Sequence, residues 1–226
     1  MTSGHPLADL WPLHEIVVRT PRLALRYPSD EDLAVLATIP SEGIHEPGRQ
    51  PFRVAWTEVE SPRRERESLQ WWWSKRASWS VDDWWLSLAV VVDGQPVGVQ
   101  DLVAKNFVTL RSVTTGSWLV RRAQGRGIGT EMRAAVVELA FRGLGALEAH
   151  SAAFDWNLPS IRVSEKVGYV PNGGELALRG TERDRLQCLR LSREAWLARR
   201  RDDIEITGLE GALGLFGLRE DLDPLV

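Results

Sequence analysis

Cysteine is almost missing from this chain, since Cys188 is the only one among its 226 residues. A single cysteine excludes an internal disulfide framework and any metal site built on a cysteine cluster. It fits a reducing compartment, where structural disulfides are rare. We therefore expect a cytoplasmic protein without a bound metal.

Long apolar runs and an excess of basic charge are also lacking. No run reaches the roughly 20 apolar residues that a transmembrane helix needs, and the first residues lack the basic-then-apolar order of a signal peptide. The formal net charge is -3, whereas dedicated nucleic-acid-binding domains usually carry a basic excess. The composition therefore predicts a globular protein with neither a membrane nor a nucleic acid as partner.

Tryptophan is abundant, with 11 copies against two tyrosines. Trp71, Trp72 and Trp73 are consecutive in a predicted helix over 63–79, and consecutive residues cannot share one helix face. At least one of them should be exposed or lie at an interface, which makes a homo-oligomer credible. The alternative is an aromatic acceptor pocket formed by this run with Trp84, Trp85 and Trp118.

The hydrophobic pattern predicts alternating strands and helices, which is an α/β fold. Ser29 with Asp32 predicts a capped helix that ends before Pro40. Asp93-Gly94 predicts a tight hairpin turn. Further helices are expected at 130–142 and 160–167. Strands are expected at 15–27, with an edge position or a break at Pro21, at 86–92, 96–102, 108–120 and 146–152, from Tyr169 onwards, and at 184–191. We expect an arm over 1–15, one domain over 16–196 and an extension over 197–226, in which 208–218 has no clear element.

A glycine-rich turn, Gln124-Gly125-Arg126-Gly127-Ile128-Gly129, stands between a predicted strand and a predicted helix. Such a turn presents free main-chain N–H groups at the positive end of a helix, which favours a phosphate group. The spacing is not G-x-G-x-x-G, and Thr130-Glu131 stands where a P-loop has its lysine. A dinucleotide site and a P-loop are therefore weak alternatives, and a glycine turn without a ligand is the remaining one.

These residues resemble the signature Q/R-x-x-G-x-G/A of the GCN5-related N-acetyltransferase (GNAT) superfamily. Residues 157–160 and 165–169 are similar to its N-x-x-S and E-K-x-G-F/Y segment, and residues 20–26 resemble the opening of the RimJ/RimL-like branch. Residues 43–56, 83–84 and 116–119 are similar to an actinobacterial group in that branch, which includes a succinyltransferase. The resemblance covers roughly 18–192.

The resemblance implies a mixed, mostly antiparallel sheet that splays at an acyl-coenzyme A site and is flanked by helices. Acetyl- or succinyl-coenzyme A would be the co-substrate. Arg121 or Arg122 would join Arg126 near the adenosine phosphates. The residues expected to bind coenzyme A are Leu119, Val120, Gln124, Gly125, Arg126, Gly127, Gly129, Thr130, Asn157 and Ser160.

The catalytic groups are less clear. Many family members have an acidic tyrosine where this chain has Ser164, so the proton for the leaving thiolate comes from Ser164, from water or from no group. His45 is the expected base because histidine titrates near neutrality. The alternatives are Asp101, His150 and Glu131, or deprotonation through water without a protein base, as the resemblance also allows. The residues expected to bind substrate are Gln100, Lys105 and Trp118, the first two by orienting the distal carboxylate of a succinyl group.

The predicted function is transfer of an acetyl or succinyl group to a primary amine by direct attack in a ternary complex. The amine would belong to a protein N-terminus, a lysine or a small molecule. Because the tyrosine is missing, the alternative is a catalytically degenerate sensor that binds acyl-coenzyme A without turnover.

Overall fold

A nine-stranded sheet forms the centre of the computed structural model, which describes residues 5–199 and 201–219. The strand order is β7-β8-β6-β5-β4-β3-β2-β1-β9. The strands are β1 (Val17–Arg19), β2 (Ala24–Arg26), β3 (Asp83–Val92), β4 (Gln95–Lys105), β5 (Ser112–Leu119), β6 (Glu148–Phe154), β7 (Val170–Arg179), β8 (Glu182–Ser192) and β9 (Glu205–Thr207).

Neighbouring strands are antiparallel except for β5 and β6, which are parallel. Asp93 and Gly94, both with positive φ, make the tight turn between β3 and β4, as the sequence predicts. The prediction of a mixed, mostly antiparallel sheet in an α/β fold is therefore confirmed.

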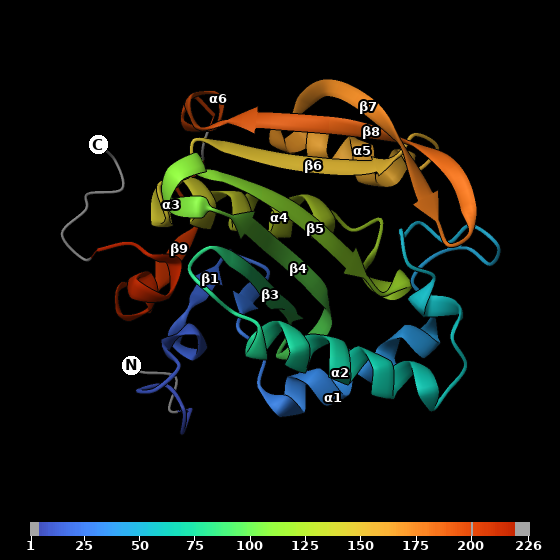
Figure 1. Cartoon of the computed structure of the whole chain (residues 1–226), viewed down its shortest axis with the longest axis horizontal. Helices are drawn as coiled ribbons and strands as arrows, with labels where there is room; N and C mark the ends of the chain where they lie inside the picture. Colours follow the sequence, from blue (N-terminus) through green and yellow to red (C-terminus); the bar gives the residue numbers. More distant parts are fainter. Residues whose placement is uncertain (1–4, 200, 220–226) are drawn as a thin grey trace.

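The helices are α1 (Asp30–Thr38), α2 (Arg63–Ala77), α3 (Phe107–Leu110), α4 (Ile128–Glu138), α5 (Leu158–Val167) and α6 (Arg193–Leu197). Figure 1 shows α1 and α2 side by side below the central strands, and these two helices pack on each other. Helix α4 packs against β4 and α5. Ser29 and Asp32 form the predicted capping box at the start of α1. Short 3₁₀ helices lie at Pro12–Glu15, Ile39–Glu42, Trp56–Glu58, Arg121–Ala123 and Glu210–Phe216, and a π-helical turn at Leu139–Gly143 extends α4.

Strands β5 and β6 pair over only three residues. The paired residues run from Ser112 with Glu148 to Thr114 with His150, although both strands continue beyond this point. The remaining halves of the two strands have no ladder bonds to each other, so the sheet is splayed there, as the resemblance implies.

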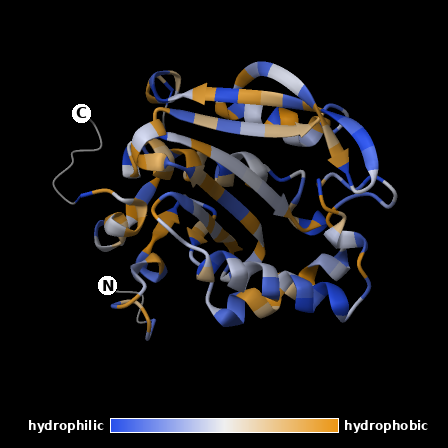
Figure 2. Ribbon diagram, in the orientation of Figure 1, coloured by the Kyte–Doolittle hydropathy of each residue, from blue (hydrophilic) through white to orange (hydrophobic). Residues whose placement is uncertain are grey.

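The two faces of the sheet differ, because successive residues of a strand point to opposite faces. On β3, Trp84 is fully buried against Phe107 and Phe216, whereas Trp85 contacts Trp71 of α2. In Figure 2, β4 carries alternating hydrophobic and hydrophilic bands, whereas β5, which borders the splay, is mostly of intermediate hydropathy. The core continues past the split, since Ala149 of β6 and Leu189 and Leu191 of β8 belong to the same buried cluster.

Two segments differ from the sequence prediction. The strand expected over 108–120 begins only at Ser112, because Phe107–Leu110 form one helical turn between Asn106 and Arg111, which both adopt left-handed φ angles. In the C-terminal extension, β9 pairs with β1, and the turn Glu210–Phe216 is packed on the core. Within the described residues, no helix is both long enough and apolar enough to span a bilayer.

Candidate active site

A cavity of about 1260 Å³ opens at the split between β5 and β6. Its walls come from the loop over 44–56, helix α2, strands β4, β5 and β6, the glycine turn, and helices α4 and α5. A cavity of this size in a splayed sheet can hold a long, flexible ligand together with a second substrate.

The glycine turn forms one end of this cavity. Gly125 and Gly127 have φ angles of +70° and +82°, which residues with side chains rarely adopt, and Gly127 caps α4. A Cβ atom at Gly125 would have no heavy atom within 4 Å. The turn therefore presents a bare main chain and a helix N-terminus to the cavity, which suits a phosphate group. Gly129 and Thr130 also line the cavity, whereas Arg126 does not.

Leu119 and Val120 differ in what their main chains offer. The Val120 N–H donates to the Val97 carbonyl at 2.9 Å, so it is not free for a ligand. Because ladder bonds alternate along a strand, the Leu119 main chain points away from β4, towards the split. The Leu119 main chain therefore faces the split, whereas Val120 is fully buried and outside the cavity wall.

Gln124 lines the cavity but uses its side chain within the protein. Its Nε2 donates to the carbonyls of Ile44 at 2.6 Å and Leu119 at 2.7 Å. The signature glutamine therefore ties the loop over 44–56 to the end of β5. Its amide N–H groups do not point at a phosphate, which sequence reasoning did not anticipate.

The arginines before the turn are held in ion pairs. Arg121 pairs with Glu46 and Arg122 pairs with Glu42, and all four side chains are exposed. Arg121 and Glu46 line the cavity, whereas Arg122 and Glu42 do not. These pairs also link the loop after α1 to the end of β5.

Asn157 and Ser160 lie where the sequence predicts them. Asn157 caps α5, its Oδ1 accepting from the Ser160 N–H at 3.4 Å, and both residues line the cavity. The capping and ligand-binding interpretations are therefore compatible.

His45 lines the cavity, yet both its ring nitrogens have partners. Nδ1 lies 2.8 Å from the Glu46 carbonyl and Nε2 lies 2.7 Å from the Thr57 hydroxyl. A carbonyl only accepts, so Nδ1 carries the proton and Nε2 accepts from Thr57. This arrangement orders the loop and leaves no nitrogen of His45 free to act as a base.

Ser164 is fully buried and does not line the cavity. Its Oγ accepts from Arg133 Nη1 at 3.2 Å, and Ser151 Oγ lies 3.5 Å away. The expected acid position is thus occupied by a hydroxyl that serves a neighbouring guanidinium. Sequence reasoning did not single out Arg133 or Ser151, both of which line the cavity.

Asp101 is one of the carboxyl groups in the cavity wall, which Glu46 and Glu67 also line. Burial raises its pKa to about 6, although a hydrogen bond from Ser87 Oγ at 2.6 Å partly offsets this effect. The neighbouring Trp85 also lines the cavity. The structure therefore favours Asp101 over His45 among the bases considered from the sequence.

The three expected substrate residues lie in different places. Trp118 lines the cavity and packs against Trp56, which in turn contacts Phe52. Gln100 is fully buried behind the wall, and its Nε2 donates to the Asp101 and Gly116 carbonyls. Lys105 pairs with Asp83 at the far end of β4 and does not line the cavity, so the structure does not place it near a substrate.

The tryptophan run of α2 divides between the core and the surface. Trp72 is buried, whereas Trp71 and Trp73 are 37% and 48% exposed. Trp71 and Trp72 also line the cavity, together with Trp85. The acceptor-pocket interpretation thus concerns Trp71 and Trp72, and the interface interpretation concerns the exposed Trp73. In the described ranges 5–199 and 201–219, no group of three His, Cys, Asp or Glu side chains is placed to hold a metal ion.

Solved structures share this fold. RimJ from Mycobacterium smegmatis, solved in complex with CoA-disulfide, matches with a TM-score of 0.66 and 19% identity over 90% of this chain and 95% of that chain. Spermidine/spermine N-acetyltransferase SpeG from Vibrio cholerae matches with a TM-score of 0.60 and 13% identity, over 79% of this chain and 98% of that one. Ribosomal-protein-S5-alanine acetyltransferase from Vibrio fischeri matches with a TM-score of 0.59 and 14% identity, over 80% of this chain and 98% of that chain.

The sequence itself matches the family model described as "Acetyltransferase (GNAT) domain" over residues 22–170. This range holds the glycine turn, the split between β5 and β6, and Asp101. The chain therefore belongs to the GNAT acetyltransferase family, whose members use acyl-coenzyme A.

Proposed function

We propose that this chain transfers an acyl group, acetyl or succinyl, from coenzyme A to a primary amine within one ternary complex. One observation carries the proposal: the same cavity contains a phosphate-accepting glycine turn and the buried carboxyl group of Asp101. Family membership supports coenzyme A as the carrier of the acyl group, and the Asp101 carboxyl group supports an amine as the acceptor.

The residues present fit coenzyme A. The main chain of Gly125 to Gly129 would hold the pyrophosphate at the start of α4, as the positive φ angles and the absent side chains allow. The Leu119 N–H and the side chain of Asn157 would bind the pantetheine amides in the split, since the Leu119 carbonyl already accepts from Gln124. The thioester supplies an activated acyl group with a thiolate as leaving group.

Asp101 would act on the amine acceptor. An amine is mostly protonated near neutral pH and must lose a proton before its lone pair can attack a carbonyl carbon. A carboxylate whose pKa is raised to about 6 is a better proton acceptor than an ordinary one and is still ionised at pH 7. The new C–N bond then forms as the C–S bond breaks and the sulfur leaves with the electron pair. The second proton that the attacking nitrogen loses passes to the leaving thiolate, directly or through water.

The aromatic wall suits a cationic acceptor. Phe52, Trp56 and Trp118 contact one another in series along one side of the cavity, and aromatic faces attract cations. An N-terminal, lysine or polyamine amine fits this chemistry, and the spermidine/spermine and ribosomal-protein-S5-alanine acetyltransferase neighbours carry such acceptors in their names. A homo-oligomer using the exposed Trp73, and a cytoplasmic location, belong to the same proposal.

Release of free thiol is the direct test. Purified protein is mixed with acetyl- or succinyl-coenzyme A and a panel of peptide N-termini, lysine and polyamines, and thiol is measured with a chromogenic disulfide. We expect release that depends on an amine and is largely lost in Asp101→Asn. Tight binding of the thioesters with no thiol release for any amine would overturn the enzyme and favour the sensor.

A further inference from the structure

Arg133 is a buried cation at the bottom of the cavity. It stands in the second turn of α4, is 2% exposed and lines the cavity. Its guanidinium donates to Ser117 Oγ and Ser151 Oγ at 3.0 Å each, to Ser164 Oγ at 3.2 Å and to Gln100 Oε1 at 3.5 Å. It thereby spans the split between β5 and β6, one serine on each strand.

These partners carry no charge. Among residues 5–199 and 201–219, Arg133 makes no ion pair with a carboxylate, in contrast to Arg121 or Arg122 near the cavity mouth. Burial lowers the pKa of Arg133, with Tyr169 as the only opposing influence. An arginine nevertheless stays protonated in proteins. The fold therefore retains a buried positive charge without a counter-ion, which is costly unless an anion arrives there.

Ser117 and Ser151 add two hydroxyl hydrogen-bond donors beside the guanidinium. Because Ser117 and Ser151 accept from the guanidinium through their oxygens, their own hydroxyl hydrogens remain available to a ligand. Both residues line the cavity with Arg133. The Gln100 amide cannot serve as a competing donor, since its Nε2 is bound to two carbonyls. A guanidinium flanked by two hydroxyl donors matches the two oxygens of a carboxylate.

The donor set lies on the opposite face of the sheet from Asp101. Gln100 pairs with Ser117 and Asp101 pairs with Gly116, and adjacent residues of a strand point to opposite faces. The cavity reaches both faces through the split. An amine deprotonated at Asp101 and an acyl chain ending at Arg133 would thus approach the reacting carbon from different sides, without competing for space.

We infer that Arg133, Ser117 and Ser151 form a subsite for the free carboxylate of a short dicarboxylic acyl group carried on coenzyme A, of the succinyl class. This inference rests on the proposed function and narrows its donor. The subsite takes the role that the sequence assigned to Gln100 and Lys105: Gln100 supports the guanidinium from behind, and Lys105 lies elsewhere. An acetyl group would leave the guanidinium without a counter-ion.

Calorimetric binding tests the subsite without needing to know the acceptor. Three thioesters of similar length are compared: succinyl-coenzyme A, its terminal amide, and butyryl-coenzyme A. We expect succinyl-coenzyme A to bind at least about tenfold more tightly than the other two, because charge-assisted hydrogen bonds are roughly twice as strong as neutral ones. Equal binding of the three thioesters by the unaltered protein would overturn the inference.

Arg133→Met removes the charge and keeps a long, flexible side chain. No carboxylate is left unpaired by this change, because the four partners of Arg133 are uncharged, and a thermal unfolding curve checks that the variant folds. We expect it to bind all three thioesters alike, at the affinity that the unaltered protein shows for butyryl-coenzyme A. Arg133→Lys keeps the charge but loses the planar guanidinium that can bind both oxygens of a carboxylate. We therefore expect it to keep part of the preference for succinyl-coenzyme A.

The matched control is Arg190→Met, which removes an exposed arginine that pairs with Glu148 on the outer strands. It should retain the full preference for succinyl-coenzyme A. If a folded Arg133→Met lost affinity equally for all three thioesters, the guanidinium would act on the part that they share or hold β5 and β6 in place. That result would overturn the subsite. Failure of the unaltered protein to bind any acyl-coenzyme A would overturn the proposed function itself, and the subsite with it.

Discussion

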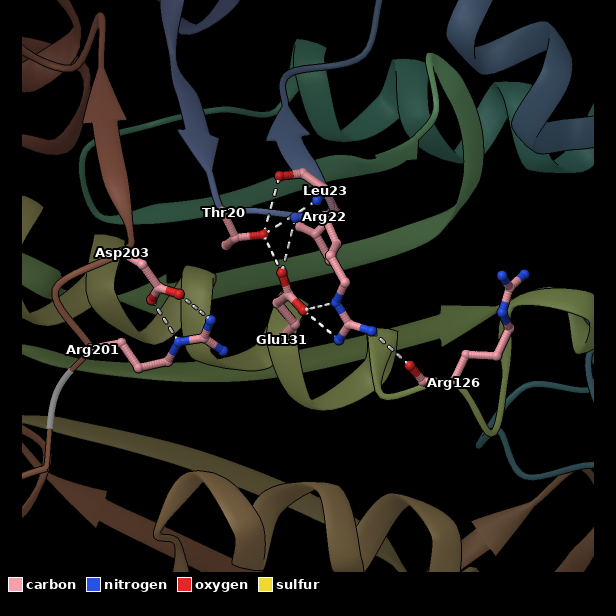
Figure 3. A network of polar contacts seen from close by, with 7 residues as sticks. All are labelled: Thr20, Arg22, Leu23, Arg126, Glu131, Arg201 and Asp203. Carbon is pink, nitrogen blue, oxygen red and sulfur yellow. Dashed lines mark hydrogen bonds and ion pairs between the residues drawn. The ribbon is translucent and has the colours of Figure 1, made fainter.

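Arg22 and Glu131 join the beginning of the domain to the glycine turn: Arg22 Nε donates to Glu131 Oε2 at 2.6 Å. Glu131 also accepts from Thr20 Oγ1 at 2.6 Å, and Arg22 Nη1 donates to the Arg126 carbonyl at 2.9 Å. Figure 3 shows Arg22 reaching from the loop after β1 to the start of α4, while the Arg126 side chain extends away. Arg22 therefore fixes the main chain of the turn from outside the cavity.

Arg22→Ala should weaken the binding of coenzyme A without removing any group from the cavity wall. A hydrogen bond to a charged partner contributes about 1.5–3 kcal/mol, of which only the part that orders the turn affects the ligand. We expect the dissociation constant, measured by calorimetry, to rise about tenfold, since about 1.4 kcal/mol is a factor of ten. An unchanged dissociation constant in a folded variant would contradict this role, and Arg63→Ala, which removes an exposed arginine outside the cavity wall, shows the effect of losing any one arginine.

The Glu131 contacts should also make stability depend on pH on the acid side. Burial by itself would raise the pKa of Glu131, but hydrogen bonds from Thr20 and Arg22 outweigh it and hold the pKa below the usual value of 4.5. A carboxyl group with a lowered pKa in the folded state stabilises the fold above the unfolded-state pKa. That contribution is lost as the pH falls below about 4.5 towards the folded-state value.

Urea unfolding between pH 3 and pH 7 measures this dependence. Glu131→Gln keeps the shape and removes the titration, so its stability should fall less steeply than that of the unaltered protein below about pH 4.5. Parallel curves for the two proteins would show that other carboxyl groups govern acid unfolding.

Asp101 should set the acid limb of the activity profile. Burial raises its pKa to about 6, so kcat/KM should fall tenfold per pH unit below that value as the base becomes protonated. Asp101→Asn should lower kcat/KM by roughly 10²- to 10⁴-fold, the usual range for general base catalysis. The thiol-release assay at pH 5 to 9 measures both effects.

Ser87→Ala separates this role from a merely structural one. The Ser87 hydroxyl donates to the Asp101 carboxylate at 2.6 Å and lowers the pKa of that group. Its removal should raise the pKa and move the acid limb to higher pH, with the plateau rate retained. If the acid limb of the kcat/KM profile stayed at the same pH in Ser87→Ala, a group other than Asp101 would be responsible for it.

The elements that follow from local pattern were predictable from the sequence. Ser29 with Asp32 predicts the capping box of α1, and Asp93-Gly94 predicts the turn between β3 and β4. The glycine turn was recognisable because its chemistry is in the main chain, which alternating glycines expose. Such features need no knowledge of distant residues.

The partners of the polar side chains were not predictable, because they come from remote segments. Gln124 meets the Ile44 carbonyl and His45 meets Thr57 only once the loop over 44–56 has folded onto β5. A signal for Arg133 was present: it interrupts the apolar run from Met132 to Val137, whose members are all buried. A charge in the middle of a buried helix face requires a partner or a ligand.

Phe216 shows that the C-terminal extension is part of the core. Its ring is fully buried and lies 5.0 Å from the Trp84 ring and 5.4 Å from the Trp79 ring, centroid to centroid. Trp79 Nε1 also donates to the Leu215 carbonyl at 2.9 Å. Phe216→Ala should lower the free energy of unfolding by about 3–5 kcal/mol, the usual cost of emptying a buried phenylalanine site.

Urea unfolding with a matched surface variant checks this value. Leu176 is 66% exposed on β7, so Leu176→Ala should change stability by less than about 0.5 kcal/mol. Phe216 does not line the cavity, so binding of coenzyme A at low temperature should survive in the variant. If Phe216→Ala were as stable as the unaltered protein, the extension would be packed on the domain without stabilising it.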